Sequence, residues 1–135
     1  IRIGNPASWE HAVRARDDRD PAHLVDWIGA QHGEIERRLA QHGAILFRGF
    51  DVFDAPTFER VARAVDDHLE NEYLGTSPRN ALTDYVFTAS ELPPFYPIPQ
   101  HCEMSFIAEP PKRLFFCCLR APADGSGETP LADFR

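Results

Sequence analysis

Residues 101–107 read HCEMSFI and form one of three short β-favouring runs in the second half of the chain. The other two runs are Tyr85 to Thr88 and Leu114 to Leu119. The last is apolar at every position, as is typical of a strand covered on both faces. Closely spaced prolines between 93 and 99 indicate a stiff, extended approach to residues 101–107. We therefore predict three strands, followed by a turn at the glycines of residues 125–127.

The first half of the chain has helical periodicity instead. From Pro21 to a C-terminal cap at Gly43, apolar residues recur at helical steps: Leu24, Trp27, Ile28, Ile35 and Leu39. The apolar run at residues 44–47 predicts a buried strand. Asp54 is a suitable N-cap for a second helix with Pro56 in its first turn. The apolar stripe of that helix is Phe58, Val61, Ala62, Val65 and Leu69.

Helices first and short strands later predict an α+β fold, a β-sandwich or barrel with helices packed outside. A length of 135 residues is enough for one domain. We expect a weakly structured start at residues 1–20, a helix–strand–helix unit at 21–70, and the first strands of the sheet at 75–135.

Composition excludes several classes of protein. A formal net charge of −7 argues against binding to the phosphate backbone of a nucleic acid. No stretch approaches the roughly 18 to 20 apolar residues of a membrane span. The three cysteines are an odd number and two are adjacent, which argues against a disulfide framework. We therefore expect a protein of the reducing cytoplasm.

Three His-x-Glu triplets occur, at residues 32–34, 68–70 and 101–103, whereas chance alone gives roughly one. The first two lie in predicted helices, where side chains two apart diverge, so we interpret them as surface residues. On a strand, side chains at i and i+2 share a face, about 6 to 7 Å apart. His101 and Glu103 are thus candidate ligands of one metal ion, with Cys102 directed oppositely into packing. The alternative is a partly buried histidine, hydrogen-bonded near a sheet edge.

An imidazole and a carboxylate, with a second histidine from elsewhere, form the facial triad of non-haem iron oxygenases. Three protein ligands leave three adjacent positions on the metal. Two of these can take a chelating 2-oxo acid and one can take dioxygen.

The wider context of this motif resembles the taurine dioxygenase/TfdA family. The resemblance is carried by residues 101–106, 114–118 and 125–133 with Pro110-Pro111 between them, and it extends back to about Gly43. Residues 77–79 and 85–88 resemble the family's approach to the site. The most similar branch contains clavaminate synthase-like enzymes and amino-acid hydroxylases of nonribosomal-peptide pathways, in which the acidic ligand is usually glutamate.

The resemblance implies a double-stranded β-helix (jelly roll) with flanking N-terminal helices. It implies iron(II) and the co-substrate 2-oxoglutarate, with His101 and Glu103 as iron ligands. Thr129 matches the family threonine that hydrogen-bonds the distal carboxylate of 2-oxoglutarate, although by itself it is equally a β-favouring strand residue. Arg79 is a candidate contact for an anionic substrate, or else an arginine of a solvated loop.

Two family elements have no counterpart here. No histidine follows His101, and the later arginine that pairs with the co-substrate carboxylate is missing as well. We expect residues 1–135 to be the N-terminal part of a single oxygenase domain. A continuation of about a hundred residues, enough for the missing strands, would supply both groups.

The expected activity is hydroxylation of an unactivated C–H bond in an amino-acid-like or natural-product molecule, free or bound to a carrier protein, with release of succinate and CO₂. Desaturation or cyclisation would use the same site. Related halogenases replace the carboxylate ligand with a small residue, whereas Glu103 is present here. The alternatives are a non-catalytic jelly-roll binding module and a zinc hydrolase. A thiol nucleophile at Cys117 or Cys118 is disfavoured, because apolar surroundings raise a thiol pKa.

Overall fold

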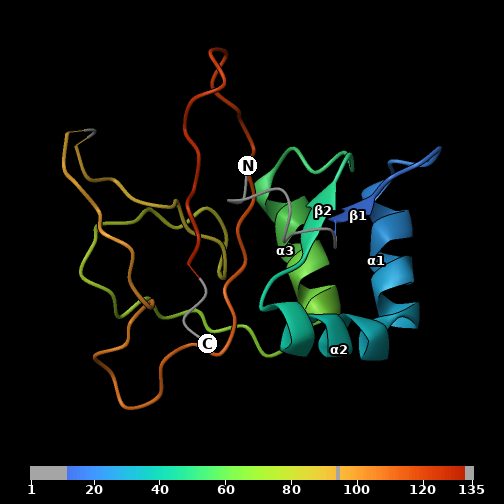
Figure 1. The fold of residues 1–135 in the computed structure, drawn as a ribbon, viewed down its shortest axis with the longest axis horizontal. Helices are drawn as coiled ribbons and strands as arrows, with labels where there is room; N and C mark the ends of the chain where they lie inside the picture. The colour runs from blue at the N-terminus through green and yellow to red at the C-terminus, as the bar shows by residue number, and fades with distance from the viewer. Residues whose placement is uncertain (1–11, 94, 133–135) are drawn as a thin grey trace.

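The computed structural model describes residues 12–93 and 95–132. Its helices and strands, in chain order, are β1 (Ala12–Arg14), α1 (Pro21–Ala30), α2 (His32–His42), β2 (Leu46–Arg48) and α3 (Ala55–Val65). These elements gather on one side of the molecule, and the chain after α3 forms long irregular loops on the other side (Figure 1).

The helix ends lie close to where the capping residues predict them. The Asp20 carboxylate accepts a hydrogen bond from the Ala22 N–H at 2.8 Å, and Pro21 begins α1. The Asp54 carboxylate accepts from the Thr57 N–H at 2.7 Å and begins α3. Gly43, with φ of +77°, ends α2 in the left-handed conformation that glycine favours. The predicted N-cap at Asp54 and the C-cap at Gly43 are confirmed.

Two helix predictions need correction. The helical region after Pro21 is divided at Gln31, whose backbone (φ −111°, ψ 17°) leaves the helical conformation. α3 ends at Val65, so Leu69 and the triplet at 68–70 lie outside it. The Asp66 carboxylate accepts a hydrogen bond from the His68 N–H, which gives the backbone a local alternative to a further helical turn.

The two strands pair in parallel, with Val13 opposite Phe47. β2 overlaps the strand predicted at 44–47, although Leu46 and Phe47 are partly buried rather than buried and Arg48 is exposed. β1 lies within the part of the chain expected to be weakly structured, and it was missed because three residues show no periodicity. The α+β class is confirmed.

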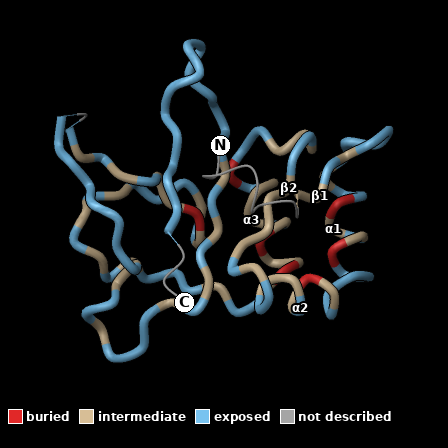
Figure 2. The backbone as a smooth tube through the Cα atoms, in the orientation of Figure 1, coloured by how far each residue is buried: buried red, intermediate tan, exposed pale blue. Residues whose placement is uncertain are grey.

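The hydrophobic core lies among the helices. Its buried residues are Leu24, Ile28, Ile35 and Val65. α1 packs against both α2 and α3, and Phe115, from the extended chain beyond, packs on the same cluster. Buried positions accordingly concentrate in the helical half (Figure 2). The segment around Phe115 therefore packs against the helical half of the molecule.

The three strands predicted after residue 80 are not formed. Residues 85–88 contribute one isolated antiparallel bridge, between Phe87 and Ala81. Residues 103–106 form turns, and residues 114–119 form neither strand nor helix. β-favouring side chains make a strand only when a neighbouring strand takes their backbone hydrogen bonds. Within the described ranges no strand lies beside either segment.

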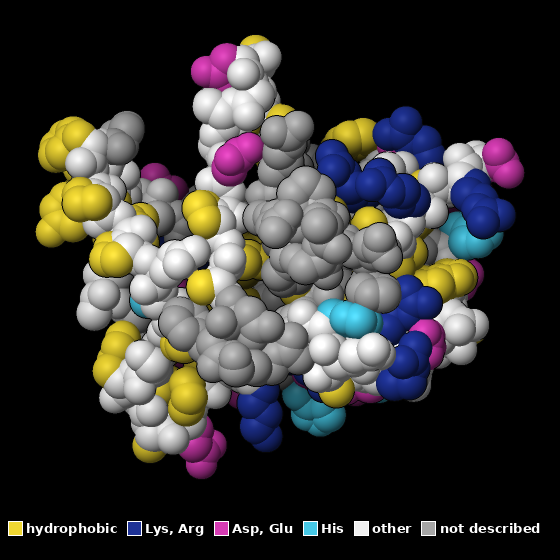
Figure 3. All heavy atoms as spheres, in the orientation of Figure 1, with side chains coloured by type: hydrophobic (Ala, Val, Ile, Leu, Met, Phe, Trp, Pro, Cys, Tyr) yellow, Lys and Arg dark blue, Asp and Glu magenta, His cyan; other side chains and the backbone are white. Residues whose placement is uncertain are grey.

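The segment at 114–119 still shows a strand-like alternation. Phe115 and Cys117 are partly buried, whereas Leu114, Phe116 and Cys118 are exposed. The prediction that both faces are covered is therefore wrong, because only the face toward the helices is covered. Apolar side chains are also exposed on the other loops, as the space-filling view shows on one face (Figure 3). No helix among the described residues is long and apolar enough to span a membrane.

Candidate metal centre

His101 and Glu103 lie together, although not for the predicted reason. His101 Nε2 is 3.3 Å from Glu103 Oε2. Glu103 belongs to a turn, in which the Ser105 N–H donates to the Cys102 carbonyl and Met104 has a positive φ of 49°, and His101 immediately precedes this turn. The turn, and not a common strand face, brings the imidazole and the carboxylate together. Cys102 is exposed, so its predicted place in packing is wrong.

The backbone before the turn determines which ring nitrogen of His101 faces Glu103. His101 Nδ1 is 2.8 Å from the Pro99 carbonyl oxygen. A carbonyl can only accept, so Nδ1 carries a proton and donates it. In the neutral ring, Nε2 then presents a lone pair to another acceptor, Glu103 Oε2. Two acceptors this close need a cation between them, either a proton on Nε2 or a metal ion.

The contacts of His101 are compatible with both a proton on Nε2 and a metal ion. The hydrogen bond to the Pro99 carbonyl is the largest influence that raises the pKa of His101 above its ordinary value, and Glu103 adds to it. The separation of 3.3 Å also suits a metal ion. Adjacent ligand atoms of an octahedral ion, each about 2.1 Å from it, lie about 3.0 Å apart. A histidine whose second nitrogen donates to a backbone carbonyl is the usual arrangement of a metal ligand. The pair therefore fits a first-row metal ion.

Arg79 joins this pair. Its Nη2 is 3.2 Å from Glu103 Oε1, and its guanidinium lies over the Tyr73 ring at 4.2 Å from the centroid. The Arg79 side chain is only 21% exposed. Arg79 thus lies in an irregular segment, as the loop alternative expects, but most of its side chain is shielded from solvent. Tyr73 was missed by sequence reasoning, because stacking between two loop residues has no local signature.

Thr129 and the cysteines lie elsewhere. Thr129 is exposed. All three cysteines are free, as predicted. Burial raises the pKa of the Cys117 thiol, which supports the interpretation of this cysteine as unreactive.

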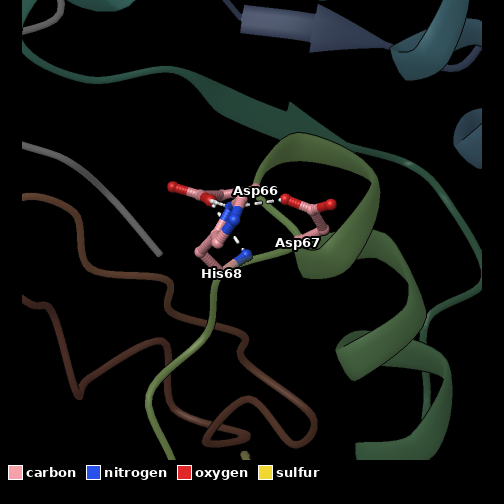
Figure 4. Close-up of side chains that lie close together, drawn as sticks. All are labelled: Asp66, Asp67 and His68. Carbon is pink, nitrogen blue, oxygen red and sulfur yellow. Dashed lines mark hydrogen bonds and ion pairs between the residues drawn. The ribbon is translucent and has the colours of Figure 1, made fainter.

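A second group of potential ligands follows α3, formed by Asp66, Asp67 and His68 (Figure 4). His68 Nδ1 lies 2.6 Å from Asp67 Oδ1, but the His68 side chain is 90% exposed. Asp66 is already engaged, by the His68 N–H and by Arg113 Nη1 at 3.2 Å. Exposed ion pairs of this kind contribute little to the stability of the fold. The group is a surface ion pair at the end of a helix, which agrees with the predicted surface position of His68.

No third side chain completes a ligand set around His101 and Glu103 within residues 12–93 and 95–132. His11 falls outside the described residues. An imidazole and a carboxylate so placed are two of the three ligands that a facial non-haem iron centre requires.

The family follows from comparison with known proteins. The chain belongs to the family described as taurine catabolism dioxygenase TauD, TfdA family, whose model matches residues 6–135. Enzymes of this family use iron(II) and 2-oxoglutarate.

Two curated relatives each match about three quarters of the chain. A clavaminate synthase-like protein of Arabidopsis thaliana is 42% identical over 104 residues, which is 77% of this chain. The dapdiamide synthesis protein DdaC of Enterobacter agglomerans is 29% identical over 102 residues, or 76% of this chain. Each match covers 31% of the relative, so the chain spans about a third of their length.

Proposed function

We propose that the protein is an iron(II)- and 2-oxoglutarate-dependent oxygenase in which His101 and Glu103 hold the metal. The observation that carries this proposal is the 3.3 Å separation of His101 Nε2 from Glu103 Oε2, with His101 Nδ1 held 2.8 Å from the Pro99 carbonyl oxygen. A third ligand, an imidazole, is expected from outside the described residues. Family membership supports a jelly-roll framework around this site.

Bound iron would combine 2-oxoglutarate with dioxygen to supply the oxidant, with succinate and CO₂ as by-products. The chain's own part is to hold two ligands in a fixed relation and to shape the surroundings of the substrate. Glu103 fills the position that a chloride ion would need, which favours hydroxylation over halogenation. Since one relative is a dapdiamide synthesis protein, we propose an amino-acid-like or natural-product substrate, free or carrier-bound. The free cysteines suit the cytoplasm.

The test of this function is aerobic turnover of 2-oxoglutarate by the full-length protein. We expect succinate to form only when iron(II) is present, and a chelator to stop its formation. Conversion of a substrate that is supported by zinc and needs no 2-oxoglutarate would favour the hydrolase alternative. Metal binding without turnover of 2-oxoglutarate, in the presence of a panel of amino-acid-like substrates, would favour the non-catalytic binding module.

Thr129 provides a separate prediction about the co-substrate. We propose that its hydroxyl donates to the distal carboxylate of 2-oxoglutarate. Thr129→Ala should then weaken 2-oxoglutarate binding by about 0.5 to 1.5 kcal/mol, or up to about 3 kcal/mol for a bond to a charged group. Metal affinity should change much less. Titration of 2-oxoglutarate into the metal-loaded protein measures the first quantity. Equal losses of co-substrate and metal affinity would indicate a structural role for Thr129 instead.

A further inference from the structure

Arg79 is held between an aromatic ring and a candidate metal ligand. The guanidinium stacks on Tyr73 on one side and pairs through Nη2 with Glu103 Oε1 on the other. Both ends of this pair are largely enclosed, with 21% of the Arg79 side chain and 16% of the Glu103 side chain exposed. Solvent therefore screens this ion pair less than it screens pairs on the open surface.

This pairing separates the roles of the two Glu103 oxygens. Oε1 faces Arg79, and Oε2 faces His101 Nε2 at 3.3 Å. A carboxylate that is free to rotate could present either oxygen, or both, to a metal ion. With Oε1 engaged by the guanidinium, Oε2 is the oxygen left for the ion beside His101.

We propose that Arg79 is a positioning residue that orients Glu103 to bind the metal through Oε2 alone, and that Tyr73 positions Arg79. This inference rests on the proposed function, since it needs His101 and Glu103 to be ligands. A partner that orients a metal-binding carboxylate typically changes metal affinity about 10- to 100-fold. The sign of the effect is informative. If the guanidinium acted mainly as a competing positive charge, its removal would strengthen metal binding.

The experiment is anaerobic titration of the full-length protein with Co(II), followed by the visible absorption of the bound ion. Arg79→Ala is expected to weaken Co(II) binding about 10- to 100-fold, and Arg79→Lys, which keeps the charge, should retain part of the affinity. Tyr73→Ala should weaken it about two- to fivefold through loss of stacking, whereas Tyr73→Phe should bind nearly as the wild type does. The shape of the Co(II) absorption spectrum should also change in Arg79→Ala, because the Glu103 carboxylate can then bind the ion through either oxygen or through both.

The chain offers a matched control in Arg63. It pairs with Glu59 through Nε at 2.9 Å and stacks over Tyr85 at 4.1 Å, and neither partner belongs to the candidate centre. Arg63→Ala removes the same kind of contacts and should leave Co(II) affinity unchanged. Circular dichroism spectra of all variants should match that of the wild type.

The outcomes separate the two proposals. Unchanged or tighter Co(II) binding in Arg79→Ala, with binding still lost in Glu103→Ala, overturns the positioning role and leaves the proposed function standing. The same result with a raised KM for an anionic substrate assigns Arg79 to substrate binding instead. Wild-type affinity in both His101→Ala and Glu103→Ala overturns the proposed centre, and the positioning role with it.

Discussion

Replacing His101 or Glu103 with alanine is expected to abolish iron-dependent turnover of 2-oxoglutarate in the full-length protein. Loss of a residue that merely orients a ligand lowers metal affinity or activity about 10- to 100-fold. Loss of a ligand itself should therefore lower turnover more than about 100-fold. The fold should persist, because neither residue contributes to the core of Leu24, Ile28, Ile35 and Val65. The measurements are succinate formation and the circular dichroism spectrum of each variant.

His32 and His68 are the matched controls for this experiment. Each stands two residues before a glutamate, as His101 does, and each is exposed. His68 also belongs to the Asp66–Asp67–His68 group. We expect near-native turnover from His32→Ala and from His68→Ala. If either control lost turnover as completely as His101→Ala does, the assignment of the centre to residues 101–103 would be wrong.

The second large effect concerns the core. Ile28 is 0% exposed and lies in α1, the helix that contacts both α2 and α3. Ile28→Ala removes three carbon atoms from a close-packed cluster, and such changes typically cost about 2 to 5 kcal/mol in the free energy of unfolding. Equilibrium unfolding in urea, monitored by circular dichroism, measures this loss.

Leu74→Ala is a suitable comparison, because Leu74 is a large apolar residue whose surface is mostly exposed. Its replacement should change the free energy of unfolding by about 0.5 kcal/mol or less. A loss below about 1 kcal/mol for Ile28→Ala would show that the helical cluster does not limit the stability of the protein.

Local chemistry explains which parts of the fold were predictable. The caps at Asp54 and Gly43 depend on one side chain or one backbone conformation, so the residue type alone reveals them. Helical periodicity likewise placed Leu24, Ile28, Ile35 and Val65 on apolar stripes, and these four residues form the core. The helical region is divided by the non-helical backbone of Gln31, and the end of α3 at Val65 is followed by a hydrogen bond from the His68 N–H to Asp66. Periodicity reports neither feature.

The candidate site likewise has features that the sequence reveals and features that only the folded chain reveals. The sequence by itself determined that His101 and Glu103 are the pair of interest, because their motif and its context resemble one family, and the family is confirmed. Only the tertiary structure decided how the pair is arranged. A strand at 101–107 would need a hydrogen-bonding neighbour, and the described chain forms a turn there instead. Tyr73 and Arg79 belong to the same irregular segment after α3. The contact of Arg79 with Glu103, in contrast, spans 24 residues. Contacts between segments this far apart arise from the folded path of the chain, for which no local pattern of residues provides a signal.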